Sequence, residues 1–278
     1  MGQPENLIRT LAEYEITVPK ASILRHPCHQ VESQDELVNL QVLPTTQRPL
    51  PVFETPWYLT NIGPQEKPLF LELRFATLSE ETNEYVALLM TTERGYQIRD
   101  IAQRMIEVVE EAGIEFDTAL GLPALGAPLA QAMSDLKGPD FYWTTCQKGR
   151  SDSPPPKPWL DPEIAYQYRS GTKPYEQVLY LDPEVFKFLK GRKIIITDDA
   201  RLTGGSSEAI INFTKHQLGL DIRAMVSVLN EAKPASEIEG VPYFGLAKIP
   251  VFKLQKEQNG FVPIQGTFDG LDWFYLEK

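Results

Sequence analysis

Two adjacent acids and a nearby stretch of small, hydroxyl-bearing residues are the best candidates for chemistry in this chain. Asp198 and Asp199 end an apolar run at 194–196, and residues 203–207 read TGGSS. Glycines lack a Cβ atom and let the backbone approach an anion, and hydroxyls and N–H groups can donate to phosphate oxygens. Paired carboxylates repel a second phosphate but accept hydrogen bonds from vicinal hydroxyls. The stretch therefore predicts a pocket for a sugar phosphate.

The elements expected around these acids are typical of a phosphate site in an α/β sheet. Residues 193–197 predict a buried strand, and a helical pattern begins by residue 209. The loop between them then lies at a helix N-terminus, where such sheets bind phosphate. An ordinary strand–turn–helix with capping Ser and Thr residues is the alternative. P-loop and dinucleotide sites are excluded, because neither G-x-x-x-x-G-K-[ST] nor G-x-G-x-x-G occurs.

This segment resembles the PRPP-binding motif of the type I phosphoribosyltransferases: a hydrophobic strand, two acids, three mostly small or apolar residues, then T-G-[GS]-[TS]. The matching residues are Asp198, Asp199, Thr203, Gly204, Gly205 and Ser206. The resemblance implies that Asp198 and Asp199 carry catalysis by holding the ribose of PRPP and, through water, Mg²⁺. It also implies a 5′-phosphate loop made of Ala200, Arg201, Leu202, Thr203, Gly204, Gly205, Ser206 and Ser207. Arg201 departs from the family, which usually has an aliphatic or small residue there.

A second segment, residues 116–132, supports the resemblance. The family's pyrophosphate loop has the pattern D-x-x-x-G-x-x-x-x-G-x-x-[LA]-A, which Asp117, Gly121, Gly126, Leu129 and Ala130 fit. The resemblance implies that backbone N–H groups of Leu122, Pro123, Ala124, Leu125 and Gly126 surround the pyrophosphate, except at proline, which has none. It also implies a cis peptide bond between Pro123 and Ala124. Leu125 replaces the Arg or Lys that the family often has.

The stretch 147–176 predicts a long irregular segment, because it contains Pro154, Pro155 and Pro156 among Ser, Lys and Gly residues. The resemblance implies that it is a mobile loop that closes over the substrates. Lys148 and Arg150 stand near the family's basic residues, while Gln147 replaces the first of them. The alternative for each basic residue is a solvated charge.

The whole chain predicts an α/β fold with a mostly parallel twisted sheet and helices on both faces. Residues 96–112 show helical periodicity, and apolar runs at 118–120, 141–146, 178–182 and 222–230 predict strands. We expect a phosphoribosyltransferase-like domain at 68–278. Residues 1–67 match no family motif and are expected to form an N-terminal extension and small hood.

Composition limits the partners. The 278-residue chain has a formal net charge of −11, which argues against a nucleic-acid surface. It has no run of about 18 apolar residues, so we expect no membrane span. Two distant cysteines, Cys28 and Cys146, favour a reduced cytoplasmic protein. The resemblance implies a homodimer.

The resemblance implies a Mg²⁺-dependent pentosyltransferase of nucleotide salvage, which transfers 5-phosphoribosyl from PRPP to a nucleobase and releases pyrophosphate. A purine is the first choice. Orotate is second, because basic residues for its carboxylate are not evident. The alternative from another class is a PRPP-binding regulator without catalysis, favoured by Leu125 and Gln147, each of which removes a basic residue.

Overall fold

The computed structural model describes residues 50–51, 57–64, 69–79, 84–89, 95–169, 175–202, 204–231, 235–255 and 260–264. They fall into two compact units. One consists of Met1–Leu89 and Ala247–Lys278, and the other of Met90–Leu246.

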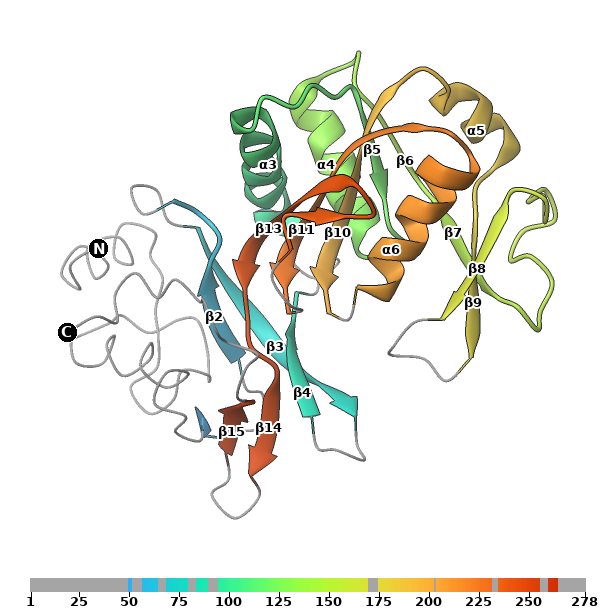
Figure 1. Ribbon diagram of the computed structural model, residues 1–278. Helices are drawn as coiled ribbons and strands as arrows, with labels where there is room; N and C mark the ends of the chain where they lie inside the picture. The colour runs from blue at the N-terminus through green and yellow to red at the C-terminus, as the bar shows by residue number, and fades with distance from the viewer. Residues whose placement is uncertain are drawn as a thin grey trace. The chain divides into compact units, whose positions relative to one another are not determined.

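The Met90–Leu246 unit is built on a six-stranded sheet with the order β12-β13-β11-β10-β5-β6 (Figure 1). The bounds are β12 (Glu237–Ile238), β13 (Val241–Lys248), β11 (Asp221–Asn230), β10 (Lys193–Arg201), β5 (Thr118–Gly121) and β6 (Tyr142–Thr145). Strands β11, β10, β5 and β6 pair in parallel, whereas β12 and β13 are antiparallel. The mostly parallel sheet expected from the sequence is confirmed. Its central strands are apolar because both of their faces are buried.

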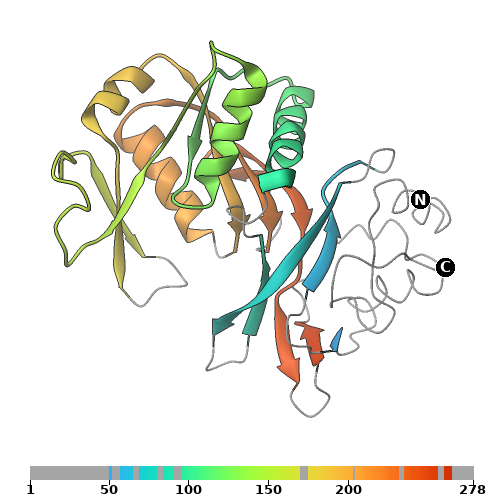
Figure 2. The same cartoon turned by 180° about the vertical axis from the view of Figure 1, so that it is seen from behind.

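Helices cover both faces of this sheet, as Figures 1 and 2 show. Helices α3 (Gly95–Glu111) and α4 (Gly126–Lys137) lie on one face, and α6 (Gly205–Ile211) lies on the other, continued by a π-helical turn at Asn212–Gln217. The periodicity that predicted a helix at 96–112 is confirmed, since Ile101, Met105 and Val109 are fully buried. None of the helices in the described ranges is long and apolar enough to cross a membrane.

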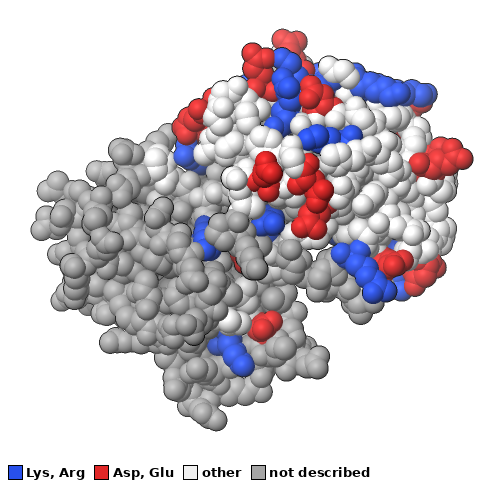
Figure 3. Space-filling view, viewed as in Figure 1, with Lys and Arg blue, Asp and Glu red and all other residues white. Residues whose placement is uncertain are grey.

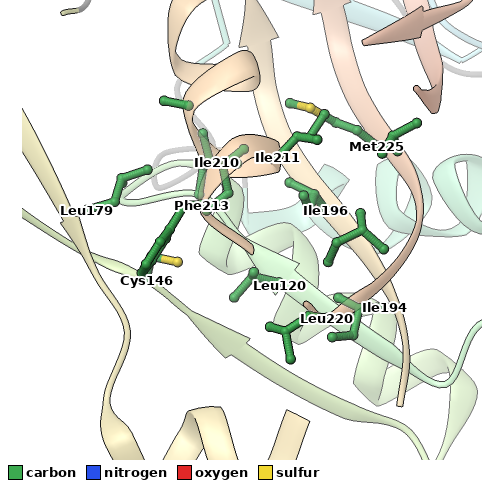
Figure 4. Close-up of a cluster of buried hydrophobic side chains, with 14 of the residues drawn as sticks. Leu120, Cys146, Leu179, Ile194, Ile196, Ile210, Ile211, Phe213, Leu220 and Met225 are labelled. Atoms are coloured by element: carbon green, nitrogen blue, oxygen red, sulfur yellow. The ribbon is translucent and has the colours of Figure 1, made fainter. Parts of the chain in front are cut away.

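An apolar cluster fixes α6 against the sheet (Figure 4). Ile210, Ile211 and Phe213 come from α6 and the turn after it, while Ile194 and Ile196 come from β10. All five side chains are fully buried. Burying an aliphatic or aromatic side chain contributes roughly 1.5–3 kcal/mol. The cluster therefore holds the helix that follows the predicted phosphate loop.

The expectation that segment 147–176 is irregular throughout is wrong, because it contains strands at 147–150 and 165–169. Strands β7 (Gln147–Arg150) and β8 (Ala165–Arg169) each pair antiparallel with β9 (Glu176–Tyr180). A short helix, α5 (Pro183–Leu189), follows, and the Asp182 side chain caps it by accepting from two backbone N–H groups. Lys148 and Arg150 thus stand on a strand.

The second six-stranded sheet belongs to the other unit and has the order β1-β15-β14-β4-β3-β2, with every neighbouring pair antiparallel. The bounds are β1 (Leu50–Pro51), β2 (Trp57–Asn61), β3 (Phe70–Ser79), β4 (Glu84–Leu88), β14 (Phe252–Gln255) and β15 (Gly260–Pro263). This pairing does not follow the expected boundary after residue 67, because β3 pairs with β2 across it. Residues 1–49 of the expected hood lie outside the described residues.

Charged side chains are distributed over the surface of the described residues. On the face in Figure 3, basic side chains lie in several separate groups. Surface pairs include Lys137 with Glu110 at 2.6 Å and Lys187 with Glu184 at 2.7 Å. Exposed pairs of this kind contribute about 0–1 kcal/mol each, so they are not what holds the fold together.

Candidate functional site

The two predicted catalytic acids lie at the carboxyl end of β10, the strand in the middle of the parallel sheet. Asp198 and Asp199 are 7% and 9% exposed, and the N–H of Asp199 donates to Oδ1 of Asp198 at 3.0 Å. Burial and then the neighbouring Asp199 charge hold the pKa of Asp198 well above its usual range, and burial raises the pKa of Asp199. Two buried acids side by side favour a ligand that donates hydrogen bonds or brings a cation.

The predicted pyrophosphate loop follows β5 and is fastened to β10 beside it. The N–H of Leu122 donates to the carbonyl of Thr197 at 2.9 Å, and Oγ1 of Thr197 donates to the carbonyl of Gly126 at 3.0 Å. A Cβ atom on Gly126 would overlap the Thr197 carbonyl oxygen, so the approach needs glycine. The cis peptide bond expected between Pro123 and Ala124 is confirmed.

The described part of the predicted 5′-phosphate loop leads into α6. Gly204 has φ of 88°, a left-handed conformation that favours glycine, and its carbonyl accepts from the N–H of Glu208 at 2.8 Å. Ser206 is half-buried, whereas Ser207 is buried and turned into the fold. Thr203 lies outside the described residues. The structure therefore places Ser206 better than Ser207 for contact with a ligand.

The two basic residues predicted for the loop at 147–176 have different surroundings in the structure. Lys148 lies close enough to the acids that its charge lowers the pKa of both Asp198 and Asp199, against the larger effect of burial. Arg150 is turned to Asp152, with its Nη2 at 2.6 Å from Oδ2 of that carboxylate. Lys148 is thus near the candidate site, and Arg150 is held in an exposed ion pair.

Arg201, which departs from the family motif, is half-buried and lies near an aromatic ring. Its guanidinium carbon lies 5.3 Å from the centre of the Tyr243 ring. The Tyr243 hydroxyl pairs with the Ser227 hydroxyl at 2.5 Å, and burial raises the pKa of Tyr243 to about 12. The arrangement places a cation and an aromatic ring beside the carboxyl ends of β10 and β11.

Glu231 is a candidate site residue that the sequence did not identify. It directly follows β11, is 4% exposed, and donates its backbone N–H to the carbonyl of Arg201 at 2.8 Å. Both oxygens of its carboxyl group lack a hydrogen-bond partner within the described ranges. Burial, with a smaller effect of the Asp199 charge, raises the pKa of Glu231 to about 8. An acid after an apolar strand was the available signal, but only the pairing of β11 with β10 shows its place.

The raised pKa of Glu231 predicts a pH effect on stability. The contribution of the raised Glu231 pKa to the free energy of unfolding is fully present below the ordinary value of 4.5. It is lost as the pH rises towards about 8, because the unfolded chain releases the proton first. Urea denaturation between pH 5 and pH 9 should show a smaller loss of stability for Glu231→Gln than for the unmodified protein, by roughly 1–3 kcal/mol. Parallel curves for the two proteins would contradict the raised pKa.

A site for Mg²⁺ built from protein ligands alone does not fit the described residues. Among them, no three His, Cys, Asp or Glu side chains lie together in a way that could hold a metal ion. Two adjacent buried carboxylates with raised pKa values fit an outer role, in which Asp198 and Asp199 accept from the water ligands of the ion.

The acid pair near the end of a central parallel strand, with a glycine-containing loop on each side, is the arrangement in which the sequence predicted a sugar-phosphate site. No family model matches the chain. A transcriptional regulator named GfcR 1 from Methanosarcina barkeri (strain Fusaro / DSM 804) is 27% identical over 149 residues, or 54% of this chain and 62% of the regulator. A hypoxanthine/guanine phosphoribosyltransferase from Methanococcus maripaludis (strain C5 / ATCC BAA-1333) is 29% identical over 142 residues, 51% of this chain and 66% of the enzyme.

The chain thus spans less than two thirds of the length of these curated relatives. Among solved structures, an adenine phosphoribosyltransferase from Rhodothermus marinus is similar with a TM-score of 0.46 and 15% identity, over 64% of this chain and 94% of that one. One from Trypanosoma brucei, in complex with AMP, pyrophosphate and ribose-5-phosphate, has a TM-score of 0.42 and 15% identity, over 59% and 70%. In its two loop motifs and its mostly parallel sheet the protein resembles the type I phosphoribosyltransferases, and about half of the chain is similar to the two curated relatives.

Proposed function

We propose that this protein transfers the 5-phosphoribosyl group of PRPP to a nucleobase and releases pyrophosphate. The observation that carries the proposal is the position of the buried acid pair, Asp198 and Asp199. It lies at the end of β10 between the loop at 122–126 and the loop that enters α6. A ribose with a phosphate at one end and a pyrophosphate at the other matches this order of groups.

In the proposed reaction, the bond between the anomeric carbon and the pyrophosphate oxygen breaks and a bond from that carbon to a base nitrogen forms. The base nitrogen releases its proton, which Asp199, with a pKa raised by burial, accepts in this proposal. Asp198 and Asp199 accept hydrogen bonds from the ribose hydroxyls and hold the ring in place. Lys148, whose charge already acts on both acids, lies near enough to balance the negative ligand. Mg²⁺ held through water by the two acids would neutralise charge on the departing pyrophosphate.

We propose an uncharged purine as the acceptor, ahead of orotate. Three buried acids lie near one another at this edge, because the Asp199 charge acts on both Asp198 and Glu231. Whether charged or neutral, these acids offer no positive charge to pair with a carboxylate on the acceptor. Action as a homodimer in the cytoplasm is part of the same proposal.

A specific feature favours a second function, a PRPP-binding regulator without catalysis. Leu125 is the residue before α4, where the family often carries a basic side chain, and Arg150 is held in an ion pair with Asp152. Both reduce the positive charge available to a leaving pyrophosphate. Some curated relatives are named as transcriptional regulators.

One experiment separates the two functions. PRPP is titrated into the protein with Mg²⁺ by calorimetry, and pyrophosphate release is then measured with a panel of bases that includes adenine, hypoxanthine, guanine and orotate. Binding with release for a base supports transfer. Binding without release for every base supports the regulator, and no binding contradicts both.

A further inference from the structure

The buried carboxyl group of Glu231 has no role in the steps described above. Both of its oxygens lack a hydrogen-bond partner in the described part of the chain, and the residue is only 4% exposed. Burying a carboxyl group without a partner costs free energy, and few buried polar groups in native proteins remain unpaired. Its backbone is fixed by the hydrogen bond from its N–H to Arg201. A fixed, unpaired carboxyl group suits a ligand that supplies the missing donor.

The order of the strands places Glu231 on the side from which an acceptor would come. Strands β5 and β11 flank β10 on opposite sides, and the predicted pyrophosphate loop follows β5. A nucleophile approaches the anomeric carbon from the side opposite the leaving group, so that the reacting atoms are aligned. If the pyrophosphate leaves beside β5, the base enters beside β11. Glu231 is the first residue after β11.

The chemistry of the group selects one feature of a base. A carboxyl group keeps at least one accepting oxygen whether it is charged or neutral. An exocyclic amino group is a donor, whereas a ring C–H at the same position would leave the accepting oxygen unpaired. Losing a hydrogen-bond partner costs more free energy at a buried polar group than at an exposed one. A base would reach the oxygens by displacing the groups that now shield them.

We propose that Glu231 accepts a hydrogen bond from the exocyclic amino group of the acceptor, so that amino-bearing nucleobases are the substrate class of this site. The inference rests on the proposed transfer function. It assigns to Glu231 a part in selecting the acceptor, with the ribose and the two phosphate groups held elsewhere.

Matched pairs of bases test the role. Adenine is compared with unsubstituted purine, and guanine with hypoxanthine, because each pair differs by a single amino group. For the unmodified protein, we expect kcat/KM from pyrophosphate release to favour the amino member of at least one pair by roughly tenfold or more. Glu231→Leu should bring that ratio close to one, and Glu231→Gln should keep most of it, because a carboxamide oxygen still accepts.

Affinity for PRPP and melting temperature, measured for both variants, separate recognition of the base from damage to the fold. An unchanged ratio in a Glu231→Leu protein that binds PRPP normally would overturn the role of Glu231. If the unmodified protein binds PRPP but releases no pyrophosphate, transfer fails as its function. The same pairs are then titrated into the protein saturated with PRPP and Mg²⁺. A preference for the amino member that Glu231→Leu abolishes would support the inference, and equal or absent binding would overturn it.

Discussion

Replacement of Asp199 by asparagine is expected to abolish pyrophosphate release and to weaken PRPP binding by about 100-fold or more. The carboxylate would accept from ribose hydroxyls and from water on Mg²⁺, and charge-assisted hydrogen bonds of this kind contribute roughly 1.5–3 kcal/mol each. An asparagine side chain keeps the shape of the residue but removes the charge that attracts the ion.

The same substitution should leave the melting temperature unchanged or slightly higher. Burial raises the pKa of Asp199, and burial with the Asp199 charge raises that of Asp198, so an ionised pair disfavours the folded state at neutral pH. Removal of one charge removes part of that cost.

Asp221→Asn is the matched control, because Asp221 is an exposed acid at the start of β11, away from the carboxyl end of the sheet. It should retain binding and turnover. Calorimetry with PRPP, pyrophosphate release and thermal denaturation measure the three effects. Full activity in Asp199→Asn would mean that this acid does not hold the ribose.

The second large effect is expected at Gly126, where replacement by alanine should destabilise the fold by about 3 kcal/mol. An added Cβ atom would overlap the Thr197 carbonyl oxygen and lie 3.2 Å from the Asp198 Cα atom. Both contacts are with backbone, which cannot rotate away as a side chain can. The shift that relieves them would also separate the loop from β10, so PRPP binding should fall with stability.

Gly113→Ala provides the comparison. Gly113 has φ of 73°, and a Cβ atom there would meet nothing within 4 Å, so only the left-handed backbone is penalised, by roughly 1 kcal/mol. Urea denaturation of both variants gives the two free energies of unfolding. Equal losses would contradict the contact between the loop and β10 as the reason for the glycine.

The sequence predicted the candidate site best where the signal was local. The apolar run before Asp198 predicted β10, because that signal lies within one strand–loop–helix segment. The cis bond after Pro123 was expected from the resemblance of this loop to the family's pyrophosphate loop. Strand β7 was missed because Gln147 to Arg150 is polar, and a strand with one partly buried face shows little apolar patterning.

Features that depend on distant pairing could not be predicted in this way. Strand β14 pairs with β4 from the opposite end of the chain, so the division into two units is invisible to a local pattern. Glu231 is a similar case. An acid after a strand is common, and its importance follows only from the parallel pairing of Arg201 with Asn230 beside it.

Thr197 has a consequence for which molecules the protein can distinguish. Its carbonyl and its hydroxyl both bind the loop after β5, while the same strand continues through Arg201 into the loop before α6. If the two loops bind the two phosphate-bearing ends of PRPP, a single stretch of backbone sets the separation between them. The protein would then discriminate ligands by length: ribose 5-phosphate or pyrophosphate alone would occupy one end, and only a molecule spanning both would gain the combined affinity.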